Sequence, residues 1–177
     1  MPTWPYNQRE LYCYPAVPDH VSLPWDAGDE YLLQLAEQQP TVVFNDRHGA
    51  IASSMADDVQ PVLDSACALH ALRRNWPNTE APQHLWLEQP SNKLNGFKQA
   101  LIKSPKSFDA LLRYLDWCLQ HLTMDHVIHI AGAAKHIPVN WPKWLEQHSE
   151  HYQQHRIVRK ARAVRLRLTA APGRQTW

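Results

Sequence analysis

The sequence has few cysteines and few glycines, and it has no long apolar run. Its cysteines, Cys13, Cys67 and Cys118, lie far apart and form no Cys-x-x-Cys pair, which argues against a disulfide framework and against a zinc site. We interpret them as small buried apolar residues. No stretch of about 18 apolar residues is present to cross a membrane, and prolines and polar residues stand where a signal peptide needs an apolar core. We therefore expect a cytoplasmic protein without a membrane partner.

The shortage of glycine matters most in one turn. The apolar residues 41–44 predict a buried strand, and a polar turn over 45–49 leads from it into an apolar helix. In an open α/β sheet, the turn after the first such strand usually holds a nucleotide cofactor, because backbone amides and a helix N-terminus meet an anion there. Such a turn needs two or three glycines, whereas this one has Gly49 alone, behind the bulky Arg47 and His48. The sequence thus predicts a cofactor pocket that is present in outline but filled by side chains.

Strands and helices alternate through the rest of the chain. The length favours a single domain over residues 1–177, with an extended lead-in over 1–24, strand-like only at 11–14, and an α/β core over 25–177. Helices are predicted from a cap at Asp26 or Asp29 to residue 36, over 50–55, from Ser65 to 75, from Ser107 to 122 and over 140–152. Strands are predicted at 41–44, 60–64, 84–87, 99–102 and 126–130, and a hairpin over 157–158 and 163–168. This order predicts a doubly wound α/β sheet, mostly parallel, with right-handed crossovers and an antiparallel C-terminal hairpin.

Charge is distributed unevenly along the chain, although the net charge is only +1. Through residue 65 the basic side chains are Arg9 and Arg47, against many acids. After Glu150 there is no acid, while seven basic side chains follow: Arg156, Arg159, Lys160, Arg162, Arg165, Arg167 and Arg174. Such an asymmetry indicates a polyanionic partner at one end of the molecule.

Several short motifs together resemble one protein family. They are residues 24–34 (PWDAGDEYLLQ), Asn45-Asp46 with Gly49-Ala50, 101–103 (LIK) with Pro105-Lys106, 130–133 (IAGA) and 160–162 (KAR). The pattern resembles the N-terminal domain of ribosomal RNA large subunit methyltransferase G, a bacterial guanine-N2 methyltransferase family dependent on S-adenosylmethionine. The resemblance implies a Rossmann-like methyltransferase fold and a second, C-terminal copy that binds S-adenosylmethionine and carries an Asn-Pro-Pro-Phe type tetrapeptide. It also implies that the N-terminal copy has lost its cofactor and helps to hold ribosomal RNA.

The predicted cofactor site is degenerate, at Asn45, Asp46, Gly49 and Asp64. Asp46 is expected to accept backbone amides of the following helix, and Asp64 either matches the acid that binds a ribose or caps a helix. Where the tetrapeptide would stand, the sequence reads Lys103-Ser104-Pro105-Lys106. Lysine side chains cannot accept hydrogen bonds from an exocyclic amino group, so no catalytic residue of the family has a counterpart here.

Basic residues are the candidates for RNA contact. Lys103, Lys106 and Lys135 follow the predicted strands, and Arg156, Arg159, Lys160 and Arg162 lie in the basic tail. Solvated lysines, and a charged outer face of an edge hairpin, are the competing interpretations. The eight tryptophans could stack on bases, but Trp117, Trp141 and Trp144 lie on apolar helix faces and are assigned to the core. His148, His151 and His155 would share a helical face, but no fourth metal ligand is identified.

Three functional hypotheses follow from the sequence. The first is a catalytically silent domain of a ribosomal RNA guanine-N2 methyltransferase, without cofactor, which binds RNA and supports a companion domain that holds S-adenosylmethionine. The second is a methyltransferase that is active by itself with an unusual pocket. The third is a protein interaction module.

Overall fold

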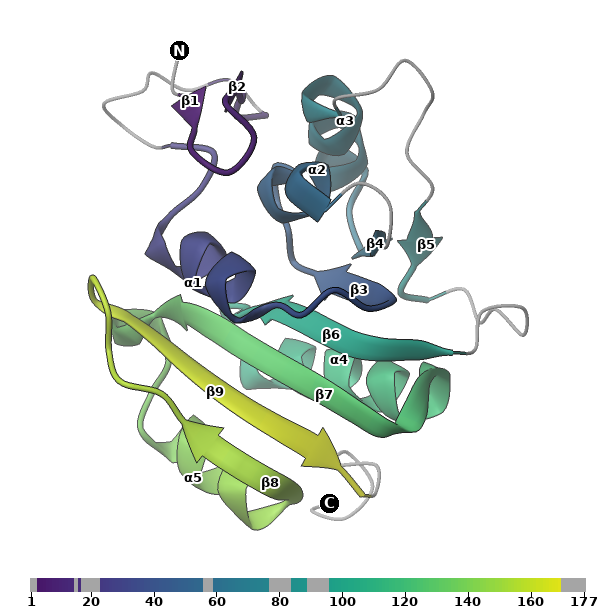
Figure 1. The fold of residues 1–177 in the computed structure, drawn as a ribbon, viewed down its shortest axis with the longest axis vertical. Coiled ribbons are helices and arrows are strands. Elements are labelled where there is room, and N and C mark those ends of the chain that lie inside the picture. The colour runs from purple at the N-terminus through teal and green to yellow at the C-terminus, as the bar shows by residue number, and fades with distance from the viewer. Residues whose placement is uncertain are drawn as a thin grey trace.

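A seven-stranded sheet forms the centre of the computed structural model, which describes residues 3–14, 16, 23–55, 59–76, 84–88 and 96–169. The strand order is β5-β4-β3-β6-β7-β9-β8 (Figure 1). The first five strands in this order are parallel, and β9 is antiparallel to both of its neighbours. The bounds are β3 Thr41–Phe44, β4 Val59–Leu63, β5 Leu85–Trp86, β6 Phe97–Lys103, β7 Leu122–Ala133, β8 Ser149–Gln154 and β9 Ala161–Leu168. The predicted fold class, a mostly parallel Rossmann-like sheet with an antiparallel C-terminal hairpin, is confirmed.

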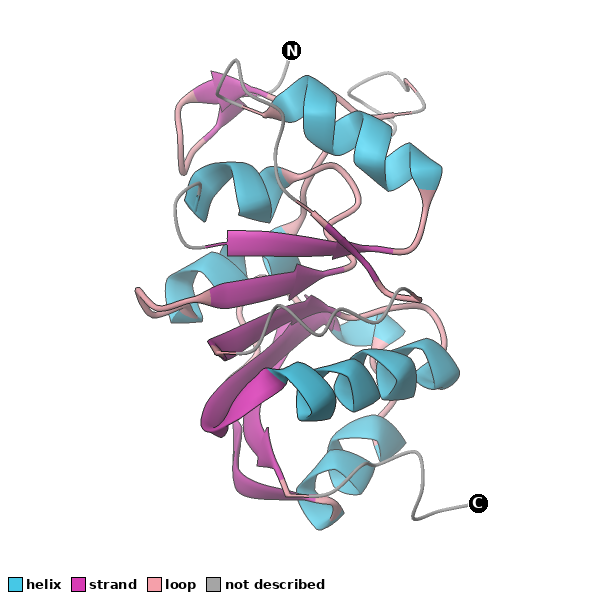
Figure 2. Ribbon diagram, turned by 90° about the vertical axis from the view of Figure 1, so that its right-hand side faces the viewer, coloured by secondary structure: helices cyan, strands magenta, loops and turns pink. Residues whose placement is uncertain are grey.

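Helices lie on both faces of this sheet (Figure 2). They are α1 (Ala27–Leu35), α2 (Ala50–Met55), α3 (Ala66–Asn75), α4 (Phe108–His121) and α5 (Asn140–Gln147), with a short 3₁₀ helix, η1, over Ala134–His136. One core cluster joins α4 and α5 to the even-numbered residues of β9, and a second joins α1, α2 and α3 to the opposite face of the sheet. Residues on β7 and β9 therefore alternate between the two faces, as the pleat requires.

Side chains cap three of the helices where the sequence predicts. Asp26 and Asp29 form a reciprocal capping box at α1, so both candidate caps are used. Ser65 accepts from the backbone N–H of Ala68, and Ser107 accepts from that of Ala110. These bonds satisfy amides that have no partner within the first turn of a helix.

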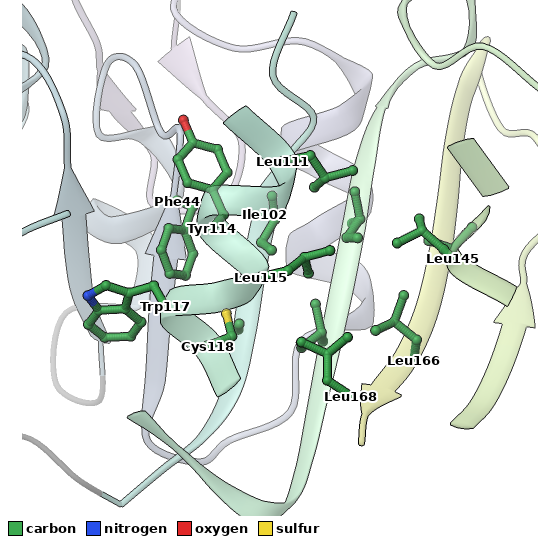
Figure 3. Packing of buried hydrophobic residues seen from close by; sticks show 14 of the residues in the cluster. Phe44, Ile102, Leu111, Tyr114, Leu115, Trp117, Cys118, Leu145, Leu166 and Leu168 are labelled. Carbon is green, nitrogen blue, oxygen red and sulfur yellow. The ribbon is translucent and has the colours of Figure 1, made fainter. Parts of the chain in front are cut away.

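The helix α4 supplies five buried residues to the larger core, more than any other element (Figure 3). Leu111, Leu115 and Cys118 recur at three- and four-residue spacing and are fully buried. The ring of Trp117 meets Phe44 of β3 edge-on, with centroids 5.4 Å apart. Trp117 is 6% exposed and Trp141 7% exposed, so their assignment to the core is confirmed.

The lead-in and one cysteine differ from expectation. Residues 11–14 are not a strand; instead β1 (Thr3–Trp4) pairs with β2 (Arg9–Glu10) in an antiparallel hairpin. Cys67 is exposed, Cys13 is half-buried, and Cys118 alone is buried as predicted. Cys67 lies in the first turn of α3, whose buried face is formed by Ala71, Leu72 and Asn75 near its other end.

The segment after α5 is a strand, where the sequence predicted a helix to residue 152. His148 ends α5 and stacks on Trp144 with ring centroids 4.0 Å apart, and β8 then begins at Ser149. His148, His151 and His155 therefore do not share a helical face. The hairpin partner of β9 is β8, and Ile157–Val158 lie in the connection instead. The sequence of β8 is polar and lacks the apolar alternation that would predict a strand, because an edge strand can be solvated on one face and along one side.

Candidate functional site

The carboxyl ends of β3, β4, β6 and β7 meet at one edge of the sheet, which we call the carboxyl edge. The strand β9 runs the other way, so its first residue, Ala161, pairs with the last residue of β7, Ala133, at this same edge. In a doubly wound sheet this edge is the usual place for a ligand. It gathers the turn after β3, Asp64, residues 103–106, η1 and the turn that precedes β9.

Asn45 closes the gap between the ends of β3 and β6. Its backbone adopts the left-handed conformation, with φ +61°, which asparagine tolerates better than most residues. Its Nδ2 donates to the carbonyl oxygens of Lys103, at 3.0 Å, and Ser104, at 3.3 Å. Two carbonyl groups at the centre of the carboxyl edge are thus already hydrogen-bonded within the protein.

Asp46 holds the start of α2, as the sequence predicted. Its carboxylate accepts from the backbone N–H groups of Ile51, at 3.2 Å, and Ala52, at 2.9 Å. Burial, and then the neighbouring charge of Asp29, raise the pKa of Asp46 to about 7. Gly49 has φ +74°, and a Cβ at this position would lie 3.0 Å from Leu72 Cδ1. The one glycine of the turn is therefore required by the packing of α3.

The lead-in is attached to this turn by Asn75, which sequence reasoning missed. Asn75 Nδ2 donates to the carbonyl oxygens of Tyr12, at 2.8 Å, and His48, at 2.7 Å, while its Oδ1 accepts from the backbone N–H of Tyr12 at 2.8 Å. His48 Nδ1 accepts from the N–H of Tyr14 at 3.3 Å. Burial, followed by the positive charge of Arg47, lowers the pKa of His48 to about 4, so the ring is neutral at pH 7. The only sequence signal was a polar residue at the end of an apolar helix face.

Lys103 is buried in an ion-pair cluster with the first turn of α1. Its Nζ lies 2.8 Å from Asp29 Oδ2 and 2.9 Å from Asp26 Oδ1, and its side chain is 16% exposed. Burial disfavours the ammonium, but the carboxylates of Asp29 and Asp26 outweigh it and raise the pKa of Lys103. Gly28 allows this approach, because a Cβ there would lie 2.9 Å from Lys103 Cε and from Gly132 Cα. The ammonium is thus paired with two carboxylates within the protein, and the RNA contact expected of Lys103 stays a prediction.

Asp64 is exposed at the end of β4 and does not cap α3, because Ser65 does. Its Oδ2 accepts from the hydroxyl of Tyr114 of α4 at 3.0 Å. Burial and then the charge of Asp64 raise the pKa of Tyr114 above its ordinary range. The acid expected at a ribose therefore already bonds a phenol from a neighbouring helix, which spacing along the sequence could not reveal.

Five of the predicted RNA-binding residues are exposed at the carboxyl edge, and we call them the basic rim: Lys106, Lys135, Arg156, Arg159 and Lys160. Arg159 and Lys160 form a two-residue turn between Val158 and Ala161, with φ +51° and +64°. Positive φ at both central residues is the type I′ geometry, which favours asparagine and glycine over long side chains. The carbonyl oxygen of Lys160 accepts from the N–H of Ala134 at 2.8 Å, which ties this turn to η1.

Arg162, the last of the seven predicted residues, lies on the face of the sheet that packs against α4 and α5. It lines a small apolar pocket with Trp141, Leu145 and Ile137, and its buried Nε has no hydrogen-bond partner in the part of the chain that the structure describes. In the ranges that the structure describes, no helix is long and apolar enough to cross a membrane, and no group of His, Cys, Asp or Glu could hold a metal ion.

Comparison with known proteins identifies similar sequences. The family model described as the RLMG N-terminal domain matches residues 2–170. Ribosomal RNA large subunit methyltransferase G of Pseudomonas putida (strain W619) is 30% identical over 181 residues, which cover 97% of this chain and 48% of that protein. The protein of the same name from Cronobacter sakazakii is 36% identical over 132 residues, 70% of this chain and 34% of that protein. The chain thus spans about half the length of the curated relatives it matches.

Solved structures of methyltransferases share the fold. A T. thermophilus 16S rRNA N2 methyltransferase in complex with AdoMet and guanosine has a TM-score of 0.64 at 12% identity, over 83% of this chain and 40% of that one. A putative methyltransferase from Pseudomonas syringae has a TM-score of 0.59 at 14% identity, over 80% of this chain and 96% of that one. At these identities the likeness concerns the fold alone.

Proposed function

The chain belongs to the RLMG N-terminal domain family, and from this premise we propose that it is the catalytically silent domain of an S-adenosylmethionine-dependent rRNA (guanine-N2)-methyltransferase. Its relatives are named as ribosomal RNA large subunit methyltransferases and extend over about twice its length. In this proposal the domain binds ribosomal RNA and supports a companion domain, which holds S-adenosylmethionine and transfers the methyl group.

The occupied carboxyl edge is the observation that carries this proposal. A cofactor needs backbone that it can approach and polar groups that it can bond. Here the side chain of Asn45 donates to the carbonyl oxygens of Lys103 and Ser104, and the carboxylates of Asp26 and Asp29 share the single ammonium of Lys103. These residues do not fit S-adenosylmethionine.

The position of the family's tetrapeptide supports the same conclusion. A carbonyl oxygen beside an asparagine would be needed to grip the amino group of guanine. At residues 103–106 the first two carbonyl oxygens already accept from Asn45, and the side chains are Lys, Ser, Pro and Lys. A guanine amino group would have to share these carbonyl oxygens with Asn45, and no asparagine side chain stands at residues 103–106 to accept a second hydrogen bond from it.

The basic rim supplies the proposed RNA contacts. Its side chains are exposed, they come from three separate loops, and they line one edge of the sheet. Lysine and arginine at such positions bond phosphate oxygens and fix orientation without reading sequence. The domain would therefore position the RNA, while the companion domain extrudes the target guanine and modifies it.

Two measurements test this proposal. Calorimetry with S-adenosylhomocysteine should detect no binding to this chain, whereas micromolar binding would favour a domain that is itself an active methyltransferase. The logarithm of its binding constant for protein-free ribosomal RNA should fall linearly with the logarithm of the salt concentration, with a slope of about −0.7 to −0.9 per phosphate contacted. No binding at low salt would refute the RNA role and would leave the interaction module as the remaining hypothesis. Light scattering of the chain mixed with the companion domain would then show whether the two associate.

A further inference from the structure

One face of the C-terminal hairpin is left open by the helices that the structure describes. In Figure 1 the viewer looks onto β7, β9 and β8 with α4 and α5 behind them, and α1 lies over the ends of the strands at the carboxyl edge. Ala161 and Ala163 of β9 face α1 and belong to its core cluster, whereas Val164 and Leu166 belong to the cluster of α4. Arg165, two residues after Ala163, therefore points to the open face.

A row of polar side chains crosses three strands on this face. Arg165 of β9 stands directly opposite His129 of β7 on one side and opposite Gln153 of β8 on the other. Side chains of directly paired residues project from the same face and lie about 5 Å apart at Cβ. His155 follows on this face, because its backbone N–H donates to the carbonyl of Ala163 at 3.0 Å and its ring lies beside Tyr31 of α1. We call these four residues the open-face row.

Polar atoms of the row lack partners among the described residues. His129 is 3% exposed, yet neither of its ring nitrogens has a hydrogen-bond partner, and His155 Nε2 is also buried without one. No ion pair of Arg165 is found in the described part of the chain. Arg167, next on the same face, contrasts with it: its guanidinium bonds Glu150 at 2.9 Å. A buried imidazole without a partner is unusual enough in a native protein to need an explanation.

The chemistry of the row suits an oxyanion. Burial, then Arg165 and His155, lower the pKa of His129 to about 4, so the ring is neutral and has one N–H to donate. Burial and Arg165 also lower the pKa of His155. A guanidinium can give two parallel hydrogen bonds to a phosphate, and the amide of Gln153 offers a further donor. The charges that act on both rings are those of basic groups, and Glu150, the carboxylate next to the row on this face, is paired with Arg167.

We infer that the open-face row binds a backbone phosphate of the RNA, held by the Arg165 guanidinium and by N–H groups of His129 and Gln153. This inference rests on the proposed RNA-binding function and extends it from the carboxyl edge onto the sheet face. Continuity supports the choice of RNA, because His155 is followed at once by Arg156 of the basic rim. An RNA strand bound along the basic rim would reach the open-face row by passing along the β8–β9 connection.

A phosphate titration at constant ionic strength tests the site directly. Inorganic phosphate should shift the side-chain NMR signals of His129 in a saturable manner. The change should vanish in Arg165→Met and weaken in Arg165→Lys, which keeps the charge but loses the paired hydrogen bonds. Arg113→Met, the same change on α4 at the other face of the sheet, should respond as the wild type does. An unchanged His129 signal in the wild type would overturn the site.

An RNA titration separates this inference from the proposed function. Arg165→Met should lower the affinity for ribosomal RNA several-fold and reduce the salt slope by about one, while Arg113→Met should change neither. If wild type binds RNA and the two variants behave alike, the row is not a phosphate site and the rim remains. If the wild type does not bind RNA at low salt, both proposals fail, whatever inorganic phosphate does. Thermal melts of the variants should superimpose, which excludes unfolding as the cause.

Discussion

At the ends of β3 and β6, polar groups are bonded to one another within the protein, whereas at the end of β7 and the start of β9 basic side chains are exposed in loops. The first region joins Asn45 to two carbonyls and Lys103 to two carboxylates. The second region holds Arg159 and Lys160 in a strained turn that faces solvent. Both regions lie along the same carboxyl edge. The comparison shows that one half of the carboxyl edge is held by internal bonds, while the other half presents basic groups to solvent.

The largest expected effect comes from breaking the internal half with Lys103→Met. The ammonium would be lost, and Asp29, buried at 5% exposure beside Asp26, would have no opposite charge. Removal of one partner of a buried pair typically costs about 3 kcal/mol or more. Urea unfolding at pH 7 measures this loss. Lys98→Met, the same change at an exposed position at the start of β6, should stay within about 0.5 kcal/mol of wild type. Equal stability of the two variants would contradict a structural role for Lys103.

The pH dependence of the internal half gives the second prediction. The pKa of Asp46 is raised from 3.8 to about 7 in the folded protein. Between about pH 4 and pH 7 the unfolded chain has lost this proton while the folded chain keeps it, so the free energy of unfolding falls as pH rises and levels off above 7. Asp46→Asn has no such proton. The free energy of unfolding of the wild type minus that of the variant should therefore decrease by at least about 1.4 kcal/mol as pH rises across that window.

Urea unfolding of both proteins from pH 4.5 to 7.5 checks this prediction. The lowered pKa of His48 acts in the opposite direction below pH 6.5. The folded protein keeps this ring neutral where the unfolded chain protonates it, so the His48 contribution to the free energy of unfolding rises with pH. That contribution is present in both proteins and cancels in the difference. A difference that does not change with pH would mean that Asp46 is ionised throughout.

The strained turn gives a third prediction, of the opposite sign. Lys160 has φ +64°, which costs a side-chain-bearing residue about 1 kcal/mol relative to glycine. Lys160→Gly should raise the free energy of unfolding by about that amount and, at the same time, weaken binding to ribosomal RNA. Lys135→Gly removes another rim charge but has no positive φ to relieve, so it should weaken binding without raising stability. If Lys160→Gly gains stability and binds RNA unchanged, the lysine is not a phosphate contact.

The two halves also differ in how far the sequence predicts them. The outline of the internal half follows from local chemistry: one glycine in the turn, Asp46 before an apolar helix, and the strand ends that surround them. Its closure does not, because the partners of Lys103 come from a helix more than 70 residues earlier in the chain. No local pattern distinguishes a lysine that faces solvent from one that reaches such a helix.

The rim can be predicted from the sequence because it depends on local composition, whereas the ion pairs of Lys103 depend on contacts between distant segments. Charge without nearby acid is a property of the segment itself, and the strand order then brings Lys135 and Lys160 to one edge. Arg162 lies apart from the rim, because alternation along β9 turns it toward Trp141. No sequence pattern predicts the open-face row, since His129 and Arg165 become neighbours only through the pairing of β7 with β9.

The smallest expected change in stability distinguishes a rim cation from a structural one. Arg159 lies 3.2 Å from Glu30, and its side chain is 73% exposed. Such a surface pair contributes about 0.5 kcal/mol or less, so Arg159→Met should unfold almost as the wild type does, as should Arg113→Met, which breaks a comparable exposed pair with Glu88. Filter binding to ribosomal RNA should separate them: Arg159→Met weakens binding and lowers the salt slope by about one, and Arg113→Met does not.

Glu30→Gln breaks the same pair from the other side and removes a carboxylate that competes with phosphate for Arg159, so its RNA affinity should equal or exceed that of the wild type. If Glu30→Gln weakens binding as much as Arg159→Met does, the pair acts by holding the turn in place, and Arg159 does not contact the RNA.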